Sequence, residues 1–180
     1  LYIITLDLFF QEYFYYFLVF CIGATFGSFF TLAVYRIPIK QDITHTRSYC
    51  PKCAHKLSFI DMIPILSYVC LGGKCRYCKE KIRPRYILLE ILSGLAFVLF
   101  SASIKFSVFS MNYQTVTYFG FGLLYLATLF IIAGIDKERI KIEKPVLLFG
   151  FICVTLYMIY LYIVENDASI YRYVIYLVLA

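Results

Sequence analysis

Long apolar runs separated by short charged segments dominate the hydrophobic pattern of the chain. Four runs are long enough to cross a bilayer and carry almost no charge: residues 13–35, 86–104, 116–135 and 145–164. Since about 20 apolar residues span the hydrocarbon core of a membrane, we predict a transmembrane helix in each run. Glu90 is the only charged residue inside them. The pattern therefore predicts an all-α fold, a multi-pass bundle of membrane helices.

A further apolar run begins at residue 173 and has reached only eight residues when the sequence ends at residue 180. Eight residues are too few to cross a bilayer. Because the sequence also begins with Leu1 instead of Met, we expect it to be a fragment that is shortened mainly at its C-terminal end.

The composition agrees with a membrane protein. Of the 180 residues, 62% are hydrophobic and only 16% are charged, and the mean hydropathy is +0.80. About a quarter of the residues of an ordinary soluble domain are charged, so that class is excluded. Disordered and collagen-like chains are excluded as well, because Tyr and Phe are abundant while Gly and Pro are few.

The distribution of Lys and Arg predicts the orientation of the helices. Residues 36–85 contain eleven of the 17 basic residues, and residues 137–144 contain four more. Basic residues resist translocation, so we expect both segments to be cytoplasmic and the N-terminus to be outside.

Two C-x-x-C pairs, Cys50 with Cys53 and Cys75 with Cys78, lie within the long basic loop. Two such turns can aim four thiolates at one point, which is the geometry of a closed structural zinc site. A disulfide is the weaker alternative, because the loop is expected in the reducing cytoplasm. The sequence therefore predicts a small zinc-ribbon-like loop between the first two spans.

The remaining candidate ligands carry weaker signals. His55 lies two residues after the first pair and could replace a cysteine as a ligand, although an ordinary surface histidine is the favoured interpretation. Cys70 lies between the pairs, while Cys21 and Cys153 lie inside predicted spans. We expect these three to be structural, since Cys often fills small apolar spaces.

The loop carries a net charge of +8, from its eleven bases and from Asp42, Asp61 and Glu80. A basic surface can bind nucleic acid, but a basic helix or an aromatic platform for base stacking is missing here. A basic loop beside a membrane is instead expected to contact anionic lipid headgroups. Membrane lipid is therefore the expected partner, and nucleic acid is not.

Several motifs now combine into a family resemblance. Residues 27–30 (Gly-Ser-Phe-Phe) and 35–38 (Tyr-Arg-Ile-Pro) are similar to the G-S-F and Y-R-[LI]-P motifs of the bacterial type IV prepilin peptidases. Residues 63–68 (Ile-Pro-Ile-Leu-Ser-Tyr) lie between the cysteine pairs, and residues 85–90 follow the second pair, in the order and spacing of that family. The first hundred residues therefore resemble these aspartic peptidases of the bacterial inner membrane.

The resemblance implies that Asp136, at the cytoplasmic end of the third span, is the first catalytic aspartate. From composition alone, an ordinary cytoplasmic turn is the favoured interpretation of this residue, and only the resemblance makes the catalytic role the preferred one. The family's second catalytic aspartate lies in a G-x-G-D motif that is absent from these 180 residues. We therefore expect these residues alone to be inactive in proteolysis, because hydrolysis by paired carboxylates requires both acids. The loop after Asp136 also departs from the family, with Glu143-Lys144-Pro145 where Pro-Asp or Pro-Asn is usual.

Three further residues have both a functional and a structural interpretation. Glu90 is either part of the active site or an interfacial acid paired with Arg83 or Arg85. Gly27 and Ser28 lie in a region that the family links to substrate handling, but small residues also allow close helix packing in membranes.

The resemblance also implies what the protein does. The expected substrates are prepilins or pseudopilins, cut after a Gly at the cytoplasmic face, and the new N-terminus is then methylated with S-adenosylmethionine. The expected organisation is a first span over residues 1–35, a cytoplasmic zinc-binding loop over residues 36–85 and a transmembrane peptidase core over residues 86–180. The alternative is a non-enzymatic membrane protein whose zinc loop docks an assembly partner.

Overall fold

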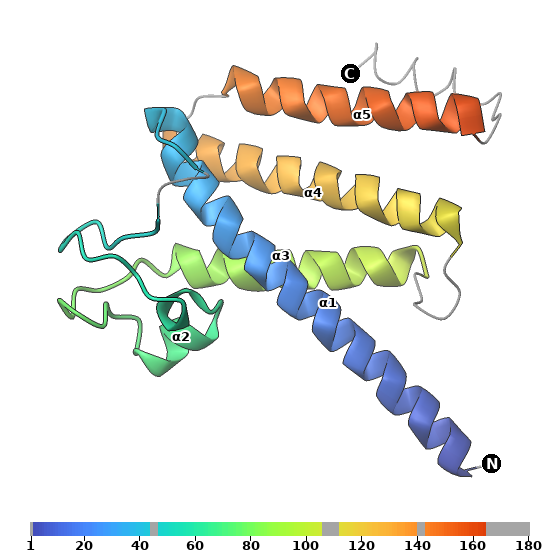
Figure 1. The fold of residues 1–180 in the computed structure, drawn as a ribbon, viewed down its shortest axis with the longest axis horizontal. Coiled ribbons are helices and arrows are strands. Elements are labelled where there is room, and N and C mark those ends of the chain that lie inside the picture. The colour runs from blue at the N-terminus through green and yellow to red at the C-terminus, as the bar shows by residue number, and fades with distance from the viewer. Residues whose placement is uncertain (1, 44–46, 106–111, 140–142, 165–180) are drawn as a thin grey trace.

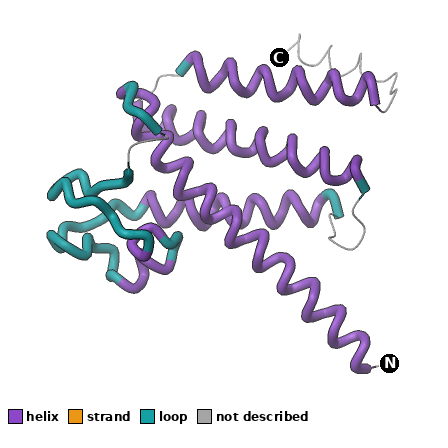
Figure 2. Tube along the Cα trace, in the orientation of Figure 1, coloured by secondary structure: helices purple, strands orange, loops and turns teal. Residues whose placement is uncertain are grey.

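The computed structural model describes residues 2–43, 47–105, 112–139 and 143–164. Within them the fold is helical, without an assigned strand (Figures 1 and 2). The long helices are α1 (Tyr2–Arg36), α3 (Arg85–Ser103), α4 (Tyr113–Arg139) and α5 (Lys144–Val164). Each contains a stretch that is long and apolar enough to cross a membrane. The predicted all-α, multi-pass fold is confirmed, while the predicted fifth run at residues 173–180 lies outside the described residues.

The long helices differ in arrangement. Helices α3, α4 and α5 lie side by side, and α1 runs diagonally across α3 to the end of α4 (Figure 1). Helix α1 begins at Tyr2, well before the predicted span, because residues 2–12 are mostly helix-compatible apolar residues that continue the same helix. The end of α1, the start of α3, the end of α4 and the start of α5 all lie at one end of the bundle.

Small residues let α1 approach α3 closely. A Cβ atom on Gly27 would lie 2.8 Å from the Cα of Glu90, and one on Gly23 would lie 2.8 Å from the Cα of Gly94. In the same interface the Ser93 hydroxyl donates a hydrogen bond of 2.7 Å to the carbonyl of Gly23. Close backbone approach through small residues is how membrane helices gain packing contacts without a hydrophobic driving force.

Helix α4 is held by glycine contacts of the same kind. A Cβ atom on Gly134 would lie 2.4 Å from Val34 of α1, and one on Gly150 of α5 would lie 2.7 Å from Thr128 of α4. Buried Ile135 joins Val34 and Val146 in an apolar cluster at the loop end of the bundle. This cluster fixes the position of the last turn of α4.

Residues 37–84 form a compact loop beside that end of the bundle. It contains two single-turn 3-10 helices, η1 (Ile37–Ile39) and η2 (Ile60–Met62), and the short helix α2 (Leu66–Cys70). Arg36 is buried at the start of the loop and donates to the carbonyls of Asp42 at 2.8 Å and Arg47 at 3.2 Å. Its guanidinium also lies over the ring of Tyr49, 5.8 Å from the centroid. One buried side chain therefore ties the end of α1 to the first part of the loop.

We predict that Gly27→Leu weakens the contact between α1 and α3. The added side chain must displace the backbone at Glu90, and overpacking of this kind costs about 1–3 kcal/mol. The measurement is the free energy of unfolding of the purified protein in a mixed-micelle detergent titration. Gly120→Leu is the matched control, because a Cβ atom at Gly120 meets nothing within 4 Å. Equal losses in the two variants would contradict the close packing of α1 and α3.

Candidate functional site

Both C-x-x-C pairs form the same turn. The N–H of Ala54 bonds to the carbonyl of Cys50 at 2.9 Å, and the N–H of Lys79 bonds to the carbonyl of Cys75 at 3.0 Å. Ala54 and Lys79 also share a left-handed backbone, with φ of 57° and 60°. The chain therefore folds back in the same way after each pair.

The residues that flank the two C-x-x-C turns are equivalent as well. A constant offset of 25 residues relates the two halves, so that Cys50 corresponds to Cys75. The shared contacts are an isolated antiparallel bridge (Tyr49 with Lys56, and Lys74 with Lys81) and two backbone hydrogen bonds (Cys50 to His55 and Leu57 to Ser48, matched by Cys75 to Glu80 and Ile82 to Gly73). We call this repeated unit a knuckle. The first knuckle covers residues 48–57 and the second covers residues 73–82, so the two pairs of cysteines are presented in the same way.

The two knuckles bring the four thiols together. The Sγ atoms of Cys50, Cys53, Cys75 and Cys78 all lie within 4.8 Å of one another. The Sγ atoms of Cys50 and Cys78 are 3.9 Å apart, close to the ~3.8 Å edge of a tetrahedron with Zn–S bonds of ~2.3 Å. The quartet could therefore hold a metal ion such as zinc, as its spacing in the sequence predicts.

The electrostatics of the quartet also favour a cation. Burial raises the pKa of the Cys50 thiol, but hydrogen bonds from the N–H groups of Cys53 and Lys52, together with those of the Cys53 and Cys75 side chains, lower the pKa to about 7. A backbone hydrogen bond from Glu80 lowers the pKa of Cys78, yet burial and the neighbouring thiols raise it to about 11. Four thiolates so close together repel one another, so a bound dication is what allows all four to ionise.

The other candidate ligands lie outside this cluster. The His55 ring lies against the ring of Tyr77 with centroids 3.6 Å apart, and His55 is not one of the four grouped ligands. Cys21 and Cys70 are exposed and Cys153 is buried, and the quartet includes none of them. Four cysteines thus account for the candidate site without the histidine.

Glu90 is buried where α3 meets α1 and the loop. Its carboxylate accepts a hydrogen bond of 2.8 Å from the N–H of Ile65, and its other partner is the side chain of Ser28. Gly27 leaves the space in which the backbone at Glu90 fits. The structure therefore brings Gly27, Ser28 and Glu90 together, and their contacts join two membrane helices to the loop.

The backbone at Ile65 has an unusual conformation. Its φ of 62° and ψ of −53° place it in a γ-turn, closed by a hydrogen bond from the N–H of Leu66 to the carbonyl of Pro64. This turn is rare and strained, above all for a β-branched residue. Because the Glu90 carboxylate binds the N–H of Ile65, it holds the strained turn in place. Ile65 lies within the motif of residues 63–68, but sequence reasoning assigned it no role of its own.

Asp61 is a second acid with an enclosed side chain, 3% exposed, that sequence reasoning did not single out. It accepts hydrogen bonds from the Ser58 hydroxyl at 2.7 Å, the Ser58 N–H at 3.1 Å and the Tyr77 hydroxyl at 3.3 Å. Its salt bridge with Arg76 Nε is 2.6 Å long. The bonds from Ser58 chiefly, with Arg76, lower the pKa of Asp61 to about 2. Asp61 thus joins η2 to the second knuckle.

Asp136 is exposed in the last turn of α4. The preceding residue, Ile135, is buried against Val34 and Val146, so the backbone at Asp136 is firmly placed. Asp136 lies at the same end of the bundle as the cysteine loop (Figure 1). Glu90 makes its hydrogen bonds with Ile65 and Ser28 and not with Asp136. The two acids therefore lie at the same end of the bundle but do not belong to one cluster.

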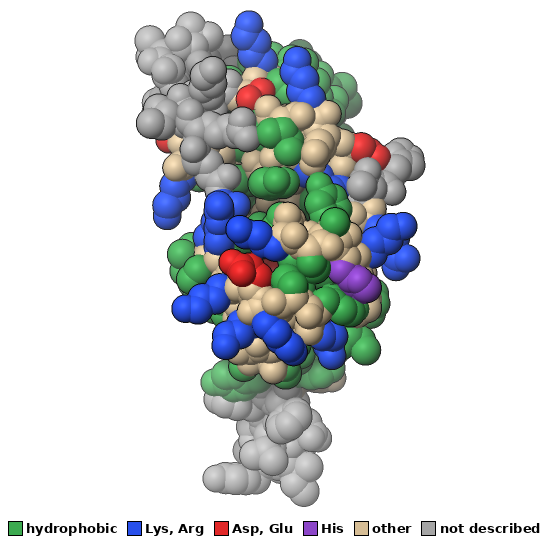
Figure 3. Space-filling view, turned by 90° about the vertical axis from the view of Figure 1, so that its left-hand side faces the viewer, with side chains coloured by type: hydrophobic (Ala, Val, Ile, Leu, Met, Phe, Trp, Pro, Cys, Tyr) green, Lys and Arg blue, Asp and Glu red, His purple; other side chains and the backbone are tan. Residues whose placement is uncertain are grey.

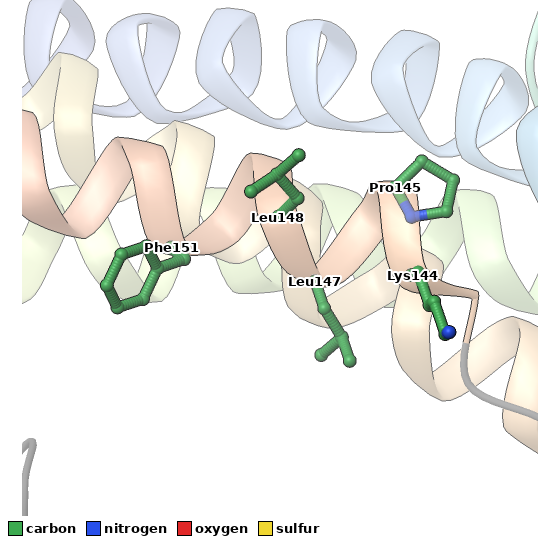
Figure 4. Close-up of a pocket in the computed structure, with 5 residues that line it drawn as sticks. All are labelled: Lys144, Pro145, Leu147, Leu148 and Phe151. Carbon is green, nitrogen blue, oxygen red and sulfur yellow. The ribbon is translucent and has the colours of Figure 1, made fainter.

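A shallow hollow along α5 is not a candidate site. Its lining comes from one helix: Lys144, Pro145, Leu147, Leu148 and Phe151 (Figure 4). The surface is almost wholly apolar and lacks a pair of groups that could perform chemistry. The candidate functional residues therefore remain the cysteine quartet, the cluster around Glu90 and Asp136.

Comparison with known proteins agrees with these features. Residues 21–104 match the family model of the bacterial peptidase A24 N-terminal domain. A prepilin leader peptidase/N-methyltransferase of Vibrio cholerae is 42% identical over 89 residues, which are 45% of this chain and 35% of that protein. Proteins of the same name from Klebsiella pneumoniae and Bacillus subtilis are 32% and 30% identical over 67% and 73% of this chain. The resemblance found in the sequence motifs is confirmed.

The extent of these matches is partial. The Klebsiella and Bacillus proteins are covered over 51% and 50% of their own lengths, so the chain spans about half or less of the curated relatives it matches. No solved structure matches this chain.

We predict that Asp61→Asn loosens the second knuckle. The amide side chain keeps the size of the acid but loses the charge that binds Arg76. Hydrogen exchange, read by mass spectrometry on peptides covering residues 73–82, should become faster. Glu80→Gln is the matched control, because it removes one exposed acid of the same loop without touching the Asp61 contacts. Unchanged exchange in Asp61→Asn would show that Asp61 does not join η2 to the knuckle.

Proposed function

We propose, on the premise that residues 21–104 belong to the bacterial peptidase A24 N-terminal domain, that this protein is a prepilin leader peptidase. It is an intramembrane aspartic endopeptidase that removes the basic leader of type IV prepilins or pseudopilins after a Gly. The observation that carries the proposal is the similarity to relatives named prepilin leader peptidase/N-methyltransferase. Their name also supports methylation of the new N-terminus, with S-adenosylmethionine as the methyl donor.

The proposed ion in the cysteine quartet is zinc. Zinc favours tetrahedral thiolate sites, and the distances between the sulfur atoms fit such a site. Cys50, Cys53, Cys75 and Cys78 occupy all four positions, so the ion has no place for water or substrate. Its role is to fold a loop that is too small and polar to form a core of its own.

Asp136 is proposed as one of the two catalytic aspartates. When two carboxylates lie a few ångströms apart, one stays protonated and polarises the peptide carbonyl while the other takes a proton from water. Exposure at the end of α4 leaves Asp136 accessible to a substrate and a second acid. The resemblance assigns the second acid to a G-x-G-D motif, which is not among these 180 residues.

Gly27, Ser28 and Glu90 are proposed to support the substrate site indirectly. Ser28 and Gly27 hold Glu90 in place, and Glu90 holds the turn at Ile65. They would therefore position the loop relative to the membrane helices, where a prepilin has to enter. We assign them a positioning role in substrate handling and not a part in bond cleavage.

The proposed topology follows from the charge distribution. The first span covers residues 1–35, the zinc-binding loop covers residues 36–85, and residues 86–180 belong to the transmembrane peptidase core. Because residues 36–85 and 137–144 contain most of the Lys and Arg, the loop and Asp136 would face the cytoplasm and the N-terminus would lie outside the bacterial inner membrane. This places the proposed cleavage at the cytoplasmic face. The partners are the prepilin and the surrounding lipid, and nucleic acid is not among them.

We predict about one zinc ion per purified protein, as a closed four-cysteine site requires. Cys75→Ser should lose the ion, whereas Cys70→Ser should retain it, because Cys70 is not in the quartet. Metal content is measured by plasma mass spectrometry. Chelation should also speed hydrogen exchange across residues 48–82. A loop that stays ordered without metal would contradict a folding role for zinc.

We predict that Asp136→Asn abolishes leader cleavage by the complete protein, because the amide cannot share a proton with a second carboxylate. Cleavage is measured on a prepilin in membrane vesicles, and insertion of the variant is checked by protease protection. The control is Glu143→Gln, which neutralises a nearby acid that has no proposed role. Normal processing by Asp136→Asn would remove the catalytic assignment. Absence of processing by the unaltered complete protein would instead favour a non-enzymatic protein whose loop docks an assembly partner.

A further inference from the structure

Residues 59–70 of the loop expose apolar side chains and enclose a charged one, which is the opposite of the usual arrangement in a loop. Among residues 59–70 the only charged residue is Asp61, and its side chain is 3% exposed, turned toward Arg76 and the second knuckle. Four of the large apolar side chains of the segment point outward, while Met62, Ile63, Ile65 and Tyr68 are half-buried. The four outward side chains are Phe59 at 80% exposed, Ile60 at 63%, Leu66 at 62% and Val69 at 62%.

These four residues form one surface feature, which we call the apolar edge. Phe59 and Ile60 lie at the start of η2, and Leu66 and Val69 are three residues apart on α2, so they share a helix face. Helix α2 and η2 pack against each other. Single exposed apolar residues are ordinary, but a group of four large ones beside a buried acid indicates an apolar neighbour.

The position of the apolar edge along the membrane-spanning helix α3 indicates what that neighbour is. Ile65, in the middle of the segment, donates its N–H to Glu90, which lies on the membrane-spanning helix α3. Glu90 is five residues beyond the start of α3 at Arg85, which is about 7.5 Å along the helix axis. The segment therefore does not project away from the bundle but returns to the level of the first turns of a membrane helix. Figure 1 shows α2 beside this part of α3.

The rest of the loop has the opposite character. Lys and Arg side chains gather on the face that the loop turns away from the bundle (Figure 3). Exposed residues such as Lys52, Lys74 and Lys79 belong to the two knuckles. Apolar side chains at membrane level with cations above them are the arrangement of a structure that lies in the interface of a bilayer.

From this arrangement we infer that residues 59–69 insert the apolar edge into the lipid bilayer at the interface and so anchor the cysteine loop to the membrane surface. The inference requires that α3 spans the membrane, and it does not depend on the proposed peptidase activity. Glu90 then has a clear physical role. It satisfies the N–H of Ile65 at a depth where water is scarce and an unpaired N–H would be costly.

Tryptophan fluorescence tests this inference, because these 180 residues contain no tryptophan. Phe59→Trp and Leu66→Trp are made in the complete protein and reconstituted into phosphatidylethanolamine–phosphatidylglycerol vesicles. The signal of the native protein is subtracted. Both variants should emit at shorter wavelength than Trp in water, lose most of their fluorescence to lipids brominated in the acyl chains and be shielded from aqueous acrylamide.

Lys52→Trp, at the tip of the first knuckle, is the matched control and should show the opposite pattern. Retention of zinc shows that each variant keeps a folded loop. Quenching of Phe59→Trp and Leu66→Trp by acrylamide but not by brominated lipid would overturn the inference. A blue shift that appears only when a prepilin is added would overturn it too, because the apolar edge would then be a protein-docking surface.

Discussion

The close contact between α1 and α3 is the constraint on which the other features of the structure depend. Gly23 and Gly27 present no side chain of their own to α3, so the backbone of α3 at Glu90 and Gly94 lies against α1. This contact fixes both ends of the loop, because α1 ends where the loop starts and α3 begins where it finishes. A loop with fixed ends has fewer conformations to lose when its knuckles close.

Inside the loop, electrostatics replaces a hydrophobic core. Two equivalent knuckles set four thiols within 4.8 Å of one another, and a bound cation would compensate the repulsion between their thiolates. Asp61 joins η2 to the second knuckle through its salt bridge with Arg76. Glu90 joins the membrane helix α3 to the loop through its hydrogen bond with the N–H of Ile65. Two acids thus hold the segment between the knuckles from opposite sides.

This arrangement has a consequence for the proposed activity. The end of α4 with Asp136, the loop and the cluster around Glu90 all lie at one end of the bundle. A leader peptide that leaves the bilayer at this end would meet the loop and the acid together. The positive loop repels a basic leader, so charge attraction alone does not explain how such a substrate is recognised. A loop anchored in anionic lipid has part of this repulsion screened.

Much of the fold and of the metal site could be predicted from the sequence. The four membrane helices follow from apolar runs of sufficient length, and the quartet follows from the spacing of Cys50, Cys53, Cys75 and Cys78. Both signals are local, because a helix in lipid must satisfy its own backbone and a C-x-x-C turn positions its own two thiols. Sequence reasoning also suggested that Gly27 is a packing residue, but it could not choose between this interpretation and a role in substrate handling.

Only the tertiary structure decided what the buried polar groups contact. Nothing in the sequence near Glu90 indicates that its partners are the N–H of Ile65 and the side chain of Ser28, which lie 25 and 62 positions away. Asp61 reads as an ordinary loop acid until Arg76 and Tyr77 are placed beside it. Such contacts join segments that are distant along the chain, and their energies depend on burial. The sequence by itself therefore determined which helices and which knuckles form, while the packing of α1 against α3 decided where the loop lies and which of its side chains face outward.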